Sequence, residues 1–337
     1  MEKNDRFLLA HGDGGLLTNK LIDATILKYL NNDILACLGD SANLPWPGEK
    51  ICFTTDSYTV DPIFFPGGDI GSLSVYGTVN DLAVSGAKPL YLSLSFIIEE
   101  GFRMGEFTKI LRSISTACRK AGVKVVTGDT KVVPKNKGDK IYINTSGIGI
   151  YDYPRAIGPG SISTGDVIIL NGSIGAHGIS VLLAREDFGI EANIVSDSQP
   201  LNLIIETLTA ANKNIHCMRD ATRGGVGTVL LELASQSGLD FEISETEIPI
   251  EDSVHGVCEI LGLDPLYIAN EGKFLLFCEE KDANQILDLI KNSSENARPA
   301  IIGRVTGKGT GRVRLRTSIG GTREIDMPVG GLLPRIC

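Results

Sequence analysis

The sequence predicts an α/β (α+β) protein built from two mixed-sheet domains and a short flexible C-terminal tail. Two successive parts of the chain each alternate short apolar runs, typical of buried strands, with segments of helical periodicity. A segment rich in Pro and Gly, residues 153–160, separates these parts. The length of 337 residues is enough for two domains of ordinary size. We therefore expect an N-terminal domain at 1–153, a C-terminal domain at 154–329 and a mobile tail at 330–337.

The first domain begins with a glycine-rich turn at residues 11–15, followed by an apolar stripe at helical spacing as far as Leu30. An amphipathic helix is expected from Glu106 to Ala121, where Gly122 provides a helix C-cap. The remaining expected elements are strands at residues 50–56, 90–96, 123–126 and 141–150 and a helix at 75–83.

The second domain repeats this alternation of strands and helices. Strands are expected at residues 167–170, 241–243, 274–277 and 313–315. Helices are expected at residues 176–185, 200–213, 225–233, 252–261 and 283–292.

Composition excludes several classes of function. The net charge of -9 argues against a surface for nucleic acid or an anionic membrane. No apolar run is long enough to cross a bilayer, and no signal peptide opens the chain, so we expect a cytoplasmic protein. The seven cysteines are scattered without a C-x-x-C pair, which indicates neither a zinc framework nor a disulfide framework.

Five aspartates each lie beside a glycine turn or at the end of an apolar segment: Asp40, Asp56, Asp81, Asp129 and Asp220. Carboxylates that cluster in space bind hard cations, and Mg²⁺ then bridges them to phosphate oxygens. The glycine turn offers backbone N–H groups that could close over a nucleotide. Each aspartate alone is explained equally well as a helix cap or turn former, so the nucleotide site is a hypothesis about the whole set.

The last eight residues end in Leu333-Pro334-Arg335-Ile336-Cys337 after a Gly-Gly pair. The pair offers a hinge, and the tail could carry its sulfur to a partner or back into a cleft. The terminal carboxylate should raise the pKa of the Cys337 thiol, whereas Arg335 could favour the thiolate. The alternative is a disordered end with an incidental thiol.

Seven runs together carry a resemblance to a known family: HGDGG (11–15), FTTDSYTVDPIFFPGGDIG (53–71), NDLAVSGAKP (80–89), VVTGDTKVV (125–133), RDATRGGVG (219–227), NEGK (270–273) and PRIC (334–337). They resemble the hydrogenase-maturation carbamoyl dehydratases, the HypE family, within the superfamily of aminoimidazole ribonucleotide synthetase and selenophosphate synthetase. The aspartate motifs are those of the superfamily, and the PRIC ending singles out the dehydratases. Two departures are the lack of paired aspartates around Asp40 and Ala221 in place of a more usual proline.

The resemblance implies an activity and its partners. The family dehydrates a carbamoyl group on its terminal cysteine to a thiocyanate with ATP and Mg²⁺, which supplies cyanide to the iron of [NiFe] hydrogenase. It implies a HypF-like carbamoyl transferase, a HypC–HypD-like scaffold complex that accepts the cyanide, and a homodimer with ATP near its interface.

The resemblance also implies site residues. Cys337 would carry the substrate, Lys131 would stabilise the transferring phosphoryl group or polarise the carbonyl, and Glu271 would act as a base. The residues that bind the nucleotide would be Gly12, Asp13, Gly14, Gly15, Asp56, Asn80, Asp81, Asp129 and Arg223, and those that hold Mg²⁺ would be Asp40, Asp56, Asp81, Asp129 and Asp220.

Simpler explanations remain open at this point. Lys131 could pair with Asp129, Glu271 could be a turn residue, and Arg223 need not contact phosphate. His177, in a glycine turn, could be structural or catalytic, and we assign it no role. Two other functions fit the same sequence: a superfamily synthetase that acts on a free small molecule, or a non-catalytic adaptor that offers its terminal thiolate.

Overall fold

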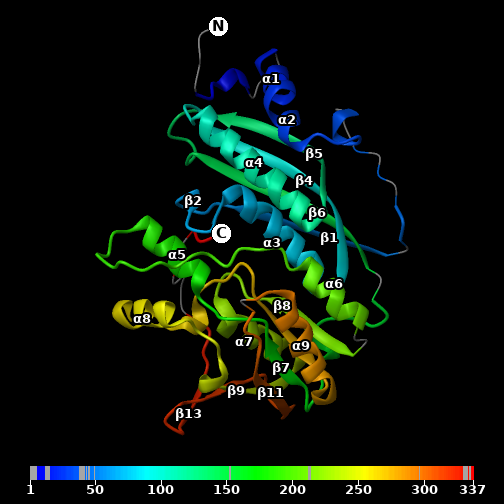
Figure 1. Ribbon diagram of the computed structural model, residues 1–337, viewed down its shortest axis with the longest axis vertical. Helices are drawn as coiled ribbons and strands as arrows, with labels where there is room; N and C mark the ends of the chain where they lie inside the picture. The colour runs from blue at the N-terminus through cyan, green and yellow to red at the C-terminus, as the bar shows by residue number, and fades with distance from the viewer. Residues whose placement is uncertain are drawn as a thin grey trace.

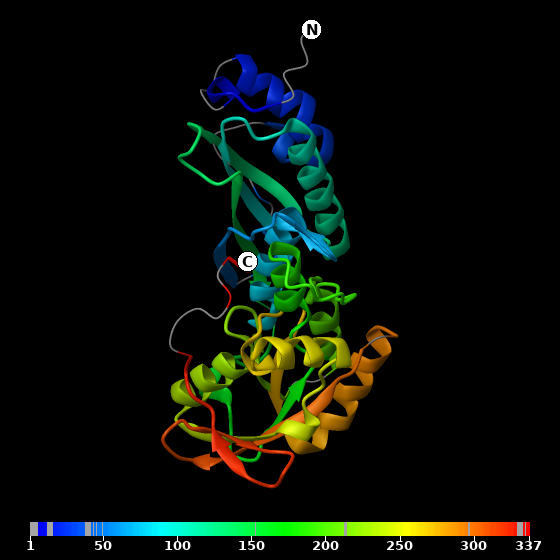
Figure 2. The same ribbon diagram turned by 90° about the vertical axis from the view of Figure 1, so that its left-hand side faces the viewer.

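The structure, a computed structural model, describes residues 6–11, 16–37, 42, 44, 46–48, 50–151, 153–211, 214–295, 297–328, 333 and 335–337. Two β-sheets with helices packed on them form two lobes stacked along the long axis of the molecule (Figure 1). The C-terminus lies between the lobes, far along the chain from the segments that surround it (Figure 2). The predicted class, α/β with two mixed sheets, is confirmed.

The N-terminal sheet has four strands in the order β1 (Ile51–Tyr58), β6 (Ile141–Tyr151), β4 (Ala87–Glu99), β5 (Lys124–Val133). The sheet is mixed because β4 pairs with β5 in parallel and with β6 antiparallel. Helices α3 (Ile70–Val84) and α4 (Met104–Ala121) cover one face. Phe107 of α4 packs edge-to-face on Phe96 of β4 at 5.1 Å between ring centroids.

On the other face of this sheet, no helix lies among the residues that the structure describes (Figure 1). Phe53 of β1 is 66 % exposed and Ile97 of β4 is 45 % exposed. The strand register places Ile148 opposite Phe53 and Tyr142 opposite Ile97, so apolar side chains form pairs across this open face. Apolar side chains that lie side by side on one face, rather than singly, are typical of a surface that contacts another protein.

The helical segment before β1 is broken into short pieces. Its parts are η1 (Leu9–His11), α1 (Leu16–Leu21), a π-helical turn (Ile22–Ile26), α2 (Leu27–Leu30) and η3 (Leu35–Cys37). The expected helix to Leu30 is therefore present with a π turn in its middle. A short hairpin, β2 (Phe64–Phe65) with β3 (Gly68–Asp69), leads into α3, whose N-terminus is capped by Asp69 and Ser72.

The C-terminal sheet has seven strands, in the order β13 (Thr322–Glu324), β12 (Val313–Arg316), β9 (Leu239–Ser244), β11 (Ala300–Lys308), β7 (Val167–Leu170), β10 (Phe274–Cys278), β8 (Ile215–Asp220). Its helices are α5 (Ala176–Arg185), α6 (Asn202–Ala211), α7 (Gly225–Ser237), α8 (Asp252–Leu261) and α9 (Ala283–Ser293). Four one-turn helices complete the domain: η4 (Pro159–Ser161), η5 (Glu245–Glu247), η6 (Pro265–Tyr267) and η7 (Glu280–Asp282). Strands β8, β11 and β13 were not predicted from the sequence.

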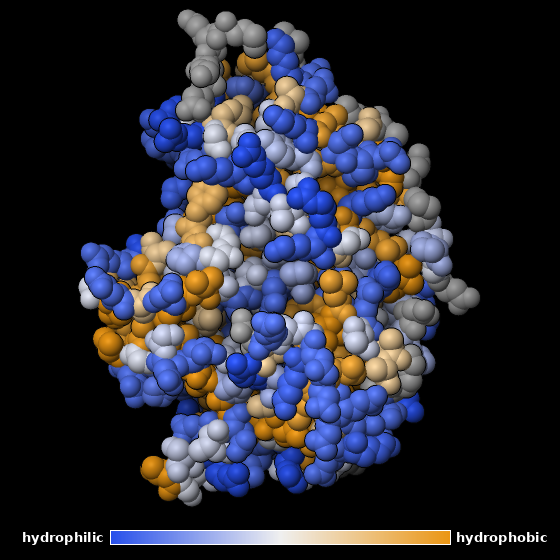
Figure 3. All heavy atoms as spheres, in the orientation of Figure 1, coloured by the Kyte–Doolittle hydropathy of each residue, from blue (hydrophilic) through white to orange (hydrophobic). Residues whose placement is uncertain are grey.

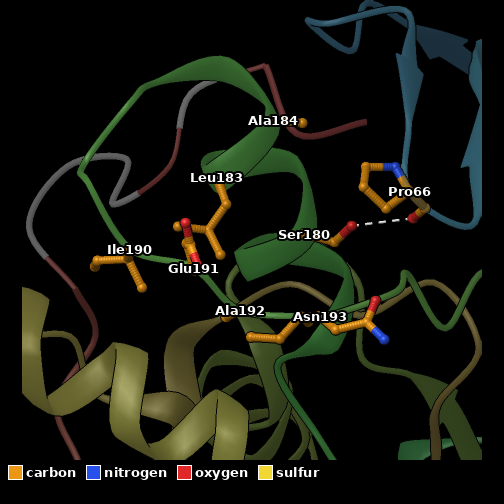
Figure 4. Close-up of a pocket in the computed structure, with 9 residues that line it drawn as sticks. Pro66, Ser180, Leu183, Ala184, Ile190, Glu191, Ala192 and Asn193 are labelled. Atoms are coloured by element: carbon orange, nitrogen blue, oxygen red, sulfur yellow. Dashed lines mark hydrogen bonds between the residues drawn. The ribbon is translucent and has the colours of Figure 1, made fainter.

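Polar contacts join the two lobes. The Asn80 amide of α3 donates to the carbonyl of Gln199 at 3.1 Å and accepts from Leu201 N–H at 2.8 Å. The Pro66 carbonyl of the β2–β3 hairpin accepts from Ser196 N–H at 2.9 Å and from Ser180 Oγ at 3.0 Å (Figure 4). These bonds fix the relative position of the lobes, on which any site between them depends.

Surface polarity varies over the molecule. The face drawn in Figure 1 is mostly hydrophilic, and hydrophobic side chains gather over α5 and α8 (Figure 3). Among the described residues, no helix is both long enough and apolar enough to span a bilayer.

Candidate active site

A cleft of about 550 Å³ lies where the lobes meet. Its walls include Thr54 of β1, Asp81 of α3, Asp220 at the end of β8, and Arg219 and Arg223 on either side of that end. Strand β8 ends at Asp220 because α7 begins after a sharp turn in which Gly224 and Gly225 both have positive φ. A side chain at 225 would meet the Leu266 carbonyl oxygen at 2.4 Å.

Three of the predicted carboxylates come together at this cleft. Asp81 accepts a hydrogen bond from Thr54 Oγ1 at 3.1 Å, and burial together with the charge of Asp56 raises the pKa of Asp81. Burial and the charge of Asp81 raise the pKa of Asp220 to about 7. Arg219 opposes both shifts. Carboxylates that raise one another's pKa across a cleft bind cations readily, because a cation removes their mutual repulsion.

Glu271 is the fourth acid of this group and lies under the cleft, 3 % exposed. Burial, and next the charges of Asp220 and Asp197, raise its pKa well above the ordinary value. Its backbone N–H donates to Asp197 Oδ1 at 3.0 Å, and Asp197 forms a 2.8 Å ion pair with Lys273. Gly272 lets this loop approach closely, since a Cβ there would lie 2.1 Å from the Asp197 carbonyl oxygen. Glu271 is thus a buried titratable group rather than an exposed turn residue.

These oxygen donors are of the kind that Mg²⁺ prefers. Burial and, in addition, the charge of a neighbouring carboxylate raise the pKa values of Asp81 and Asp220, and a divalent cation would offset this mutual repulsion. The residues present therefore fit a magnesium nucleotide. Within the described part of the chain, no three His, Cys, Asp or Glu side chains stand close enough together to hold a metal alone. A cation here would take further ligands from phosphate oxygens or water, as Mg²⁺ commonly does.

The terminal sulfur lies beside this cleft. Arg223 Nη2 is 3.4 Å from Cys337 Sγ. Burial and the charge of Glu271 raise the pKa of the Cys337 thiol to about 11, against the opposing effect of Arg223. Arg335, which the sequence suggested as the partner of the thiol, instead forms an ion pair with Asp139 and donates to the Thr59 carbonyl at 3.0 Å. Arg223 lies near the sulfur because the tail folds back over the loop after β8.

Asp129 and Lys131 lie apart from these acids. The register pairs them with Ser95 and Ile97 of β4, so their side chains stand on the open face of the N-terminal sheet. Lys131 Nζ is 2.7 Å from Asp129 Oδ1, and this hydrogen bond lowers the pKa of Asp129. The expectation that Asp129 ends a strand was wrong, because β5 continues to Val133 and the aspartate lies in its middle.

Other predicted residues have different surroundings. Asn80, expected to bind the nucleotide, is 2 % exposed and uses its amide on backbone groups of the C-terminal lobe. Gly12, Asp13, Gly14, Gly15 and Asp40 lie outside the described residues. Their assignment to the nucleotide and the cation stays a prediction.

His177 was given no role from the sequence, yet it contacts the tail. It is fully buried at the start of α5, and its Nε2 lies 2.8 Å from the Ile336 carbonyl oxygen. Its Nδ1 lies 2.8 Å from Ser196 Oγ, and its ring stands edge-to-face on Phe65. Only the fold could reveal this contact, because His177 and Ile336 are 159 residues apart.

A second hollow, of about 570 Å³, lies between α5 and the segment that follows it (Figure 4). Its lining is mostly apolar and includes Leu183, Ile190 and Ile194, with Glu191 as its only ionisable side chain among the residues described. Neither Asp81 nor Asp220 lines this hollow, so the interlobe cleft is the better candidate for chemistry.

Known proteins match this chain over nearly its whole length. Residues 38–151 match the N-terminal domain of AIR synthase related proteins, and residues 163–316 match the C-terminal domain. The carbamoyl dehydratase HypE of Azotobacter vinelandii is 43 % identical over 99 % of this chain and 98 % of its own length. HypE of Escherichia coli is 41 % identical over 98 % of each chain.

Solved structures of HypE proteins resemble this chain over nearly its whole length. A crystal structure of the hydrogenase maturation protein HypE in complex with ATP has a TM-score of 0.94 and 43 % identity, covering 98 % of this chain and 99 % of that one. HypE in a HypE–HypF complex has a TM-score of 0.80 and 41 % identity, covering 93 % of this chain and 100 % of that one. With its sulfur-bearing tail folded beside an acidic cleft, this chain belongs to the HypE family of carbamoyl dehydratases.

Proposed function

We propose that this chain uses ATP to dehydrate an S-carbamoyl group on its own Cys337 to a thiocyanate, which supplies the cyanide ligands of [NiFe] hydrogenase. The observation that carries this proposal is the position of the Cys337 sulfur, 3.4 Å from Arg223 beside the group of Asp56, Asp81, Asp220 and Glu271. Relatives named carbamoyl dehydratase over 99 % of this chain, and one solved in complex with ATP, support the same reaction.

The reaction needs activation because an amide oxygen is a poor leaving group. The carbamoyl oxygen attacks the γ-phosphorus of ATP and ADP leaves. The nitrogen loses one of its two protons, so that a carbon–nitrogen double bond forms and the oxygen becomes part of a phosphate ester on carbon. Loss of the remaining N–H proton and of inorganic phosphate then leaves a carbon–nitrogen triple bond on sulfur. The overall change is removal of one water, whose oxygen departs in phosphate. Such phosphoryl transfer depends mainly on positioning and charge stabilisation.

Residues around the sulfur suit these steps. Arg223 can contact both the substrate on Cys337 and a phosphate, and the N-terminus of α7 presents backbone N–H groups nearby. Asp56, Asp81 and Asp220 would hold Mg²⁺, which neutralises phosphate charge when bound. Burial and the charges of its acidic neighbours raise the pKa of Glu271, which favours its protonated form. Neutralising these neighbours lowers the pKa of Glu271, so that it can accept a proton from the substrate nitrogen.

Asp129 and Lys131 require a second copy of the chain to reach this chemistry. Both stand on the open sheet face that also exposes Phe53 and Ile97. We propose that the chain forms a homodimer through this face, and that Lys131 acts near the dimer interface. The apolar pairs across the face favour burial against an identical surface.

The reaction also needs a donor and an acceptor. One relative was solved in a HypE–HypF complex, which supports a HypF-like carbamoyl transferase as the donor. We propose a HypC–HypD-like scaffold as the acceptor, because a cyanide on sulfur must be passed on before another cycle. We propose that this exchange takes place in the cytoplasm. The cysteines whose side chains the structure describes are all free thiols, as is usual in that reducing compartment.

The first prediction concerns the substrate. Chain carbamoylated at Cys337 should lose the mass of one water on incubation with ATP and Mg²⁺, with one ADP formed per chain. Intact-mass spectrometry and ADP quantification measure both. A Cys337→Ala chain should show neither change. Continued ATP turnover by Cys337→Ala with a free small molecule would instead favour a superfamily synthetase.

The second prediction concerns the buried acid Asp220. Its pKa of about 7 lies above its value in the unfolded chain, so the folded state keeps a proton that the unfolded state has released. The free energy of unfolding contributed by this group is therefore largest at low pH and falls as the pH rises from about 4 to 7. Asp220→Asn should increase stability at pH 8 by on the order of 2 kcal/mol.

Urea unfolding at pH 4.5 and pH 8 measures this effect, and the gain should be nearly absent at pH 4.5. Asp240→Asn is the matched control, because backbone hydrogen bonds from the Arg312 region lower the pKa of exposed Asp240. That variant should lose stability at pH 8. If Asp220→Asn instead lowered the free energy of unfolding equally at both pH values, the raised pKa of Asp220 would be contradicted.

The third prediction concerns assembly. Light scattering should give the native chain twice the mass of one 36.0 kDa chain. Phe53→Asp, on the open face, should give single chains, because a charge would be buried against its copy. Ile260→Asp on α8, where the side chain is 69 % exposed, is the control and should leave the mass unchanged. A native chain that stays single at micromolar concentration would rule out the dimer.

A further inference from the structure

Glu271 lies in a loop, residues 270–273, whose main chain is held by groups from outside the loop. Its N–H donates to Asp197 Oδ1 at 3.0 Å. Its carbonyl oxygen accepts from Asn80 Nδ2 of α3 and from Gln199 N–H, both at 3.4 Å. The two peptide groups that flank the Glu271 side chain are therefore held by the segment 197–199 and by the N-terminal lobe.

A buried ion pair fastens the same loop a second time. Lys273 Nζ is 2.8 Å from Asp197 Oδ2, and the two side chains are only 10 % and 8 % exposed. Asp197 therefore uses one carboxylate oxygen on the main chain of Glu271 and the other on the side chain of Lys273. Between these contacts lies Gly272, where a Cβ would stand 2.1 Å from the Asp197 carbonyl oxygen. One aspartate thus holds the loop on both sides of Gly272.

The same loop is joined to a wall of the cleft. The Lys273 carbonyl oxygen accepts from Ala221 N–H at 2.9 Å. Asn270, at the other end of the loop, donates from Nδ2 to the Ala221 carbonyl oxygen at 2.8 Å. Ala221 belongs to the turn after β8, which lines the cleft on both sides of this residue. The main chain around Glu271 is therefore fixed relative to the cleft.

The buried ion pair is better explained by geometry than by stability. Burial alone would raise the pKa of Asp197, but the charge and the hydrogen bond of Lys273 outweigh burial and lower it, so the aspartate is ionised. Replacement of a buried ion pair by neutral side chains often leaves stability unchanged. We therefore attribute to this pair the geometry that it imposes on Glu271.

The position of Glu271 matters because proton transfer is sensitive to distance. A base must come within about 3 Å of the atom whose proton it accepts. Burial, and next the charge of Glu271, raise the pKa of the Cys337 thiol, so this carboxyl group lies close to the sulfur. A displacement of about 1 Å can slow a reaction by about a hundredfold. Small shifts of the loop would therefore change the rate of dehydration.

We propose that Asp197 and Lys273 are positioning residues for the dehydration step. As an ion pair they hold the main chain on both sides of Gly272, and so keep the Glu271 carboxyl group directed at the substrate nitrogen on Cys337. Neither side chain lines the cleft, and both act through Glu271. This inference rests on the proposed function, in which Glu271 accepts a proton from that nitrogen.

The double variant Asp197→Ala/Lys273→Met tests this role, because it removes both contacts without leaving a buried charge unpaired. We measure single-turnover loss of water from chain carbamoylated at Cys337, at several ATP concentrations and at a temperature where circular dichroism shows a folded variant. The rate at saturating ATP should fall about tenfold or more, and the ATP concentration for half the maximal rate should change less than about twofold. An unchanged rate, or a loss confined to ATP binding, overturns the proposal.

Two further variants separate positioning from stability. Asp197→Asn/Lys273→Met keeps an acceptor for the Glu271 N–H and should recover part of the rate; equal rates for the Asn and Ala forms overturn the role of Asp197. Asp166→Asn is the matched control, because Asp166 Oδ2 lies 2.8 Å from His216 Nδ1 in another buried pair, and neither residue lines the cleft. It should react at the native rate. A loss as large in this control would reveal a general effect of broken buried pairs and overturn the proposal.

The substitutions should act through Glu271. Glu271→Gln alone should slow dehydration at least as much as the double variant does. Addition of Asp197→Ala/Lys273→Met to Glu271→Gln should cause no further loss, because effects that operate through one group do not add. A further loss of full size would contradict a positioning role.

Hydrogen exchange measures the hold on the loop without any reaction. The Glu271 amide, bonded to Asp197 Oδ1, should exchange severalfold faster in Asp197→Ala/Lys273→Met than in the native chain or in Asp166→Asn, followed by peptide-resolved mass spectrometry. Native exchange in the double variant overturns the proposal. A native chain that never dehydrates its carbamoyl group contradicts the proposed function, whereas faster exchange still supports the hold of Asp197 on Glu271.

Discussion

The docking of residues 335–337 beside Thr59 and Asp61, through main-chain hydrogen bonds, is the interaction on which the site depends. It places a sulfur from the end of the chain at a cleft built by β1, α3 and β8. Donors come from both lobes, with Thr59 in one and His177 in the other. The tail can lie here only when the two lobes are correctly placed. The buried Asn80 amide and the Pro66 carbonyl hold the lobes in place through hydrogen bonds, so they support the site although neither contacts the sulfur.

The docked position suits a neutral substrate better than a thiolate. Burial and Glu271 raise the pKa of Cys337 to about 11, so the docked sulfur stays protonated near neutral pH. A thiolate is the nucleophile that accepts an acyl-type group, whereas an S-carbamoyl group carries no charge and can be buried without this penalty. We therefore propose that loading takes place with the tail away from the cleft, and dehydration with the tail docked. The same acidic surroundings that disfavour the thiolate would favour a divalent cation, which we propose enters with ATP.

Much of the fold could be predicted from the sequence, because strands such as Val167–Leu170 and helices such as Met104–Ala121 have clear periodicity. Strand β8 was missed because His216, Arg219 and Asp220 interrupt its apolar pattern. The site was predicted only in part. Motifs indicated Asp56, Asp81, Asp220 and Glu271, which do converge. Periodicity could not show on which face of the sheet Asp129 would stand, nor that His177 would meet the tail.

The sulfur of Cys337 rests in a partly buried, acidic site, and titration of its thiol tests this position most directly. The rate of alkylation of Cys337, followed by peptide-resolved mass spectrometry, should still rise steeply with pH between about 8 and 10, because the thiol pKa is about 11. A rate that levels off above about pH 9.5, as for a free thiol with a pKa of about 8.5, would contradict a docked tail.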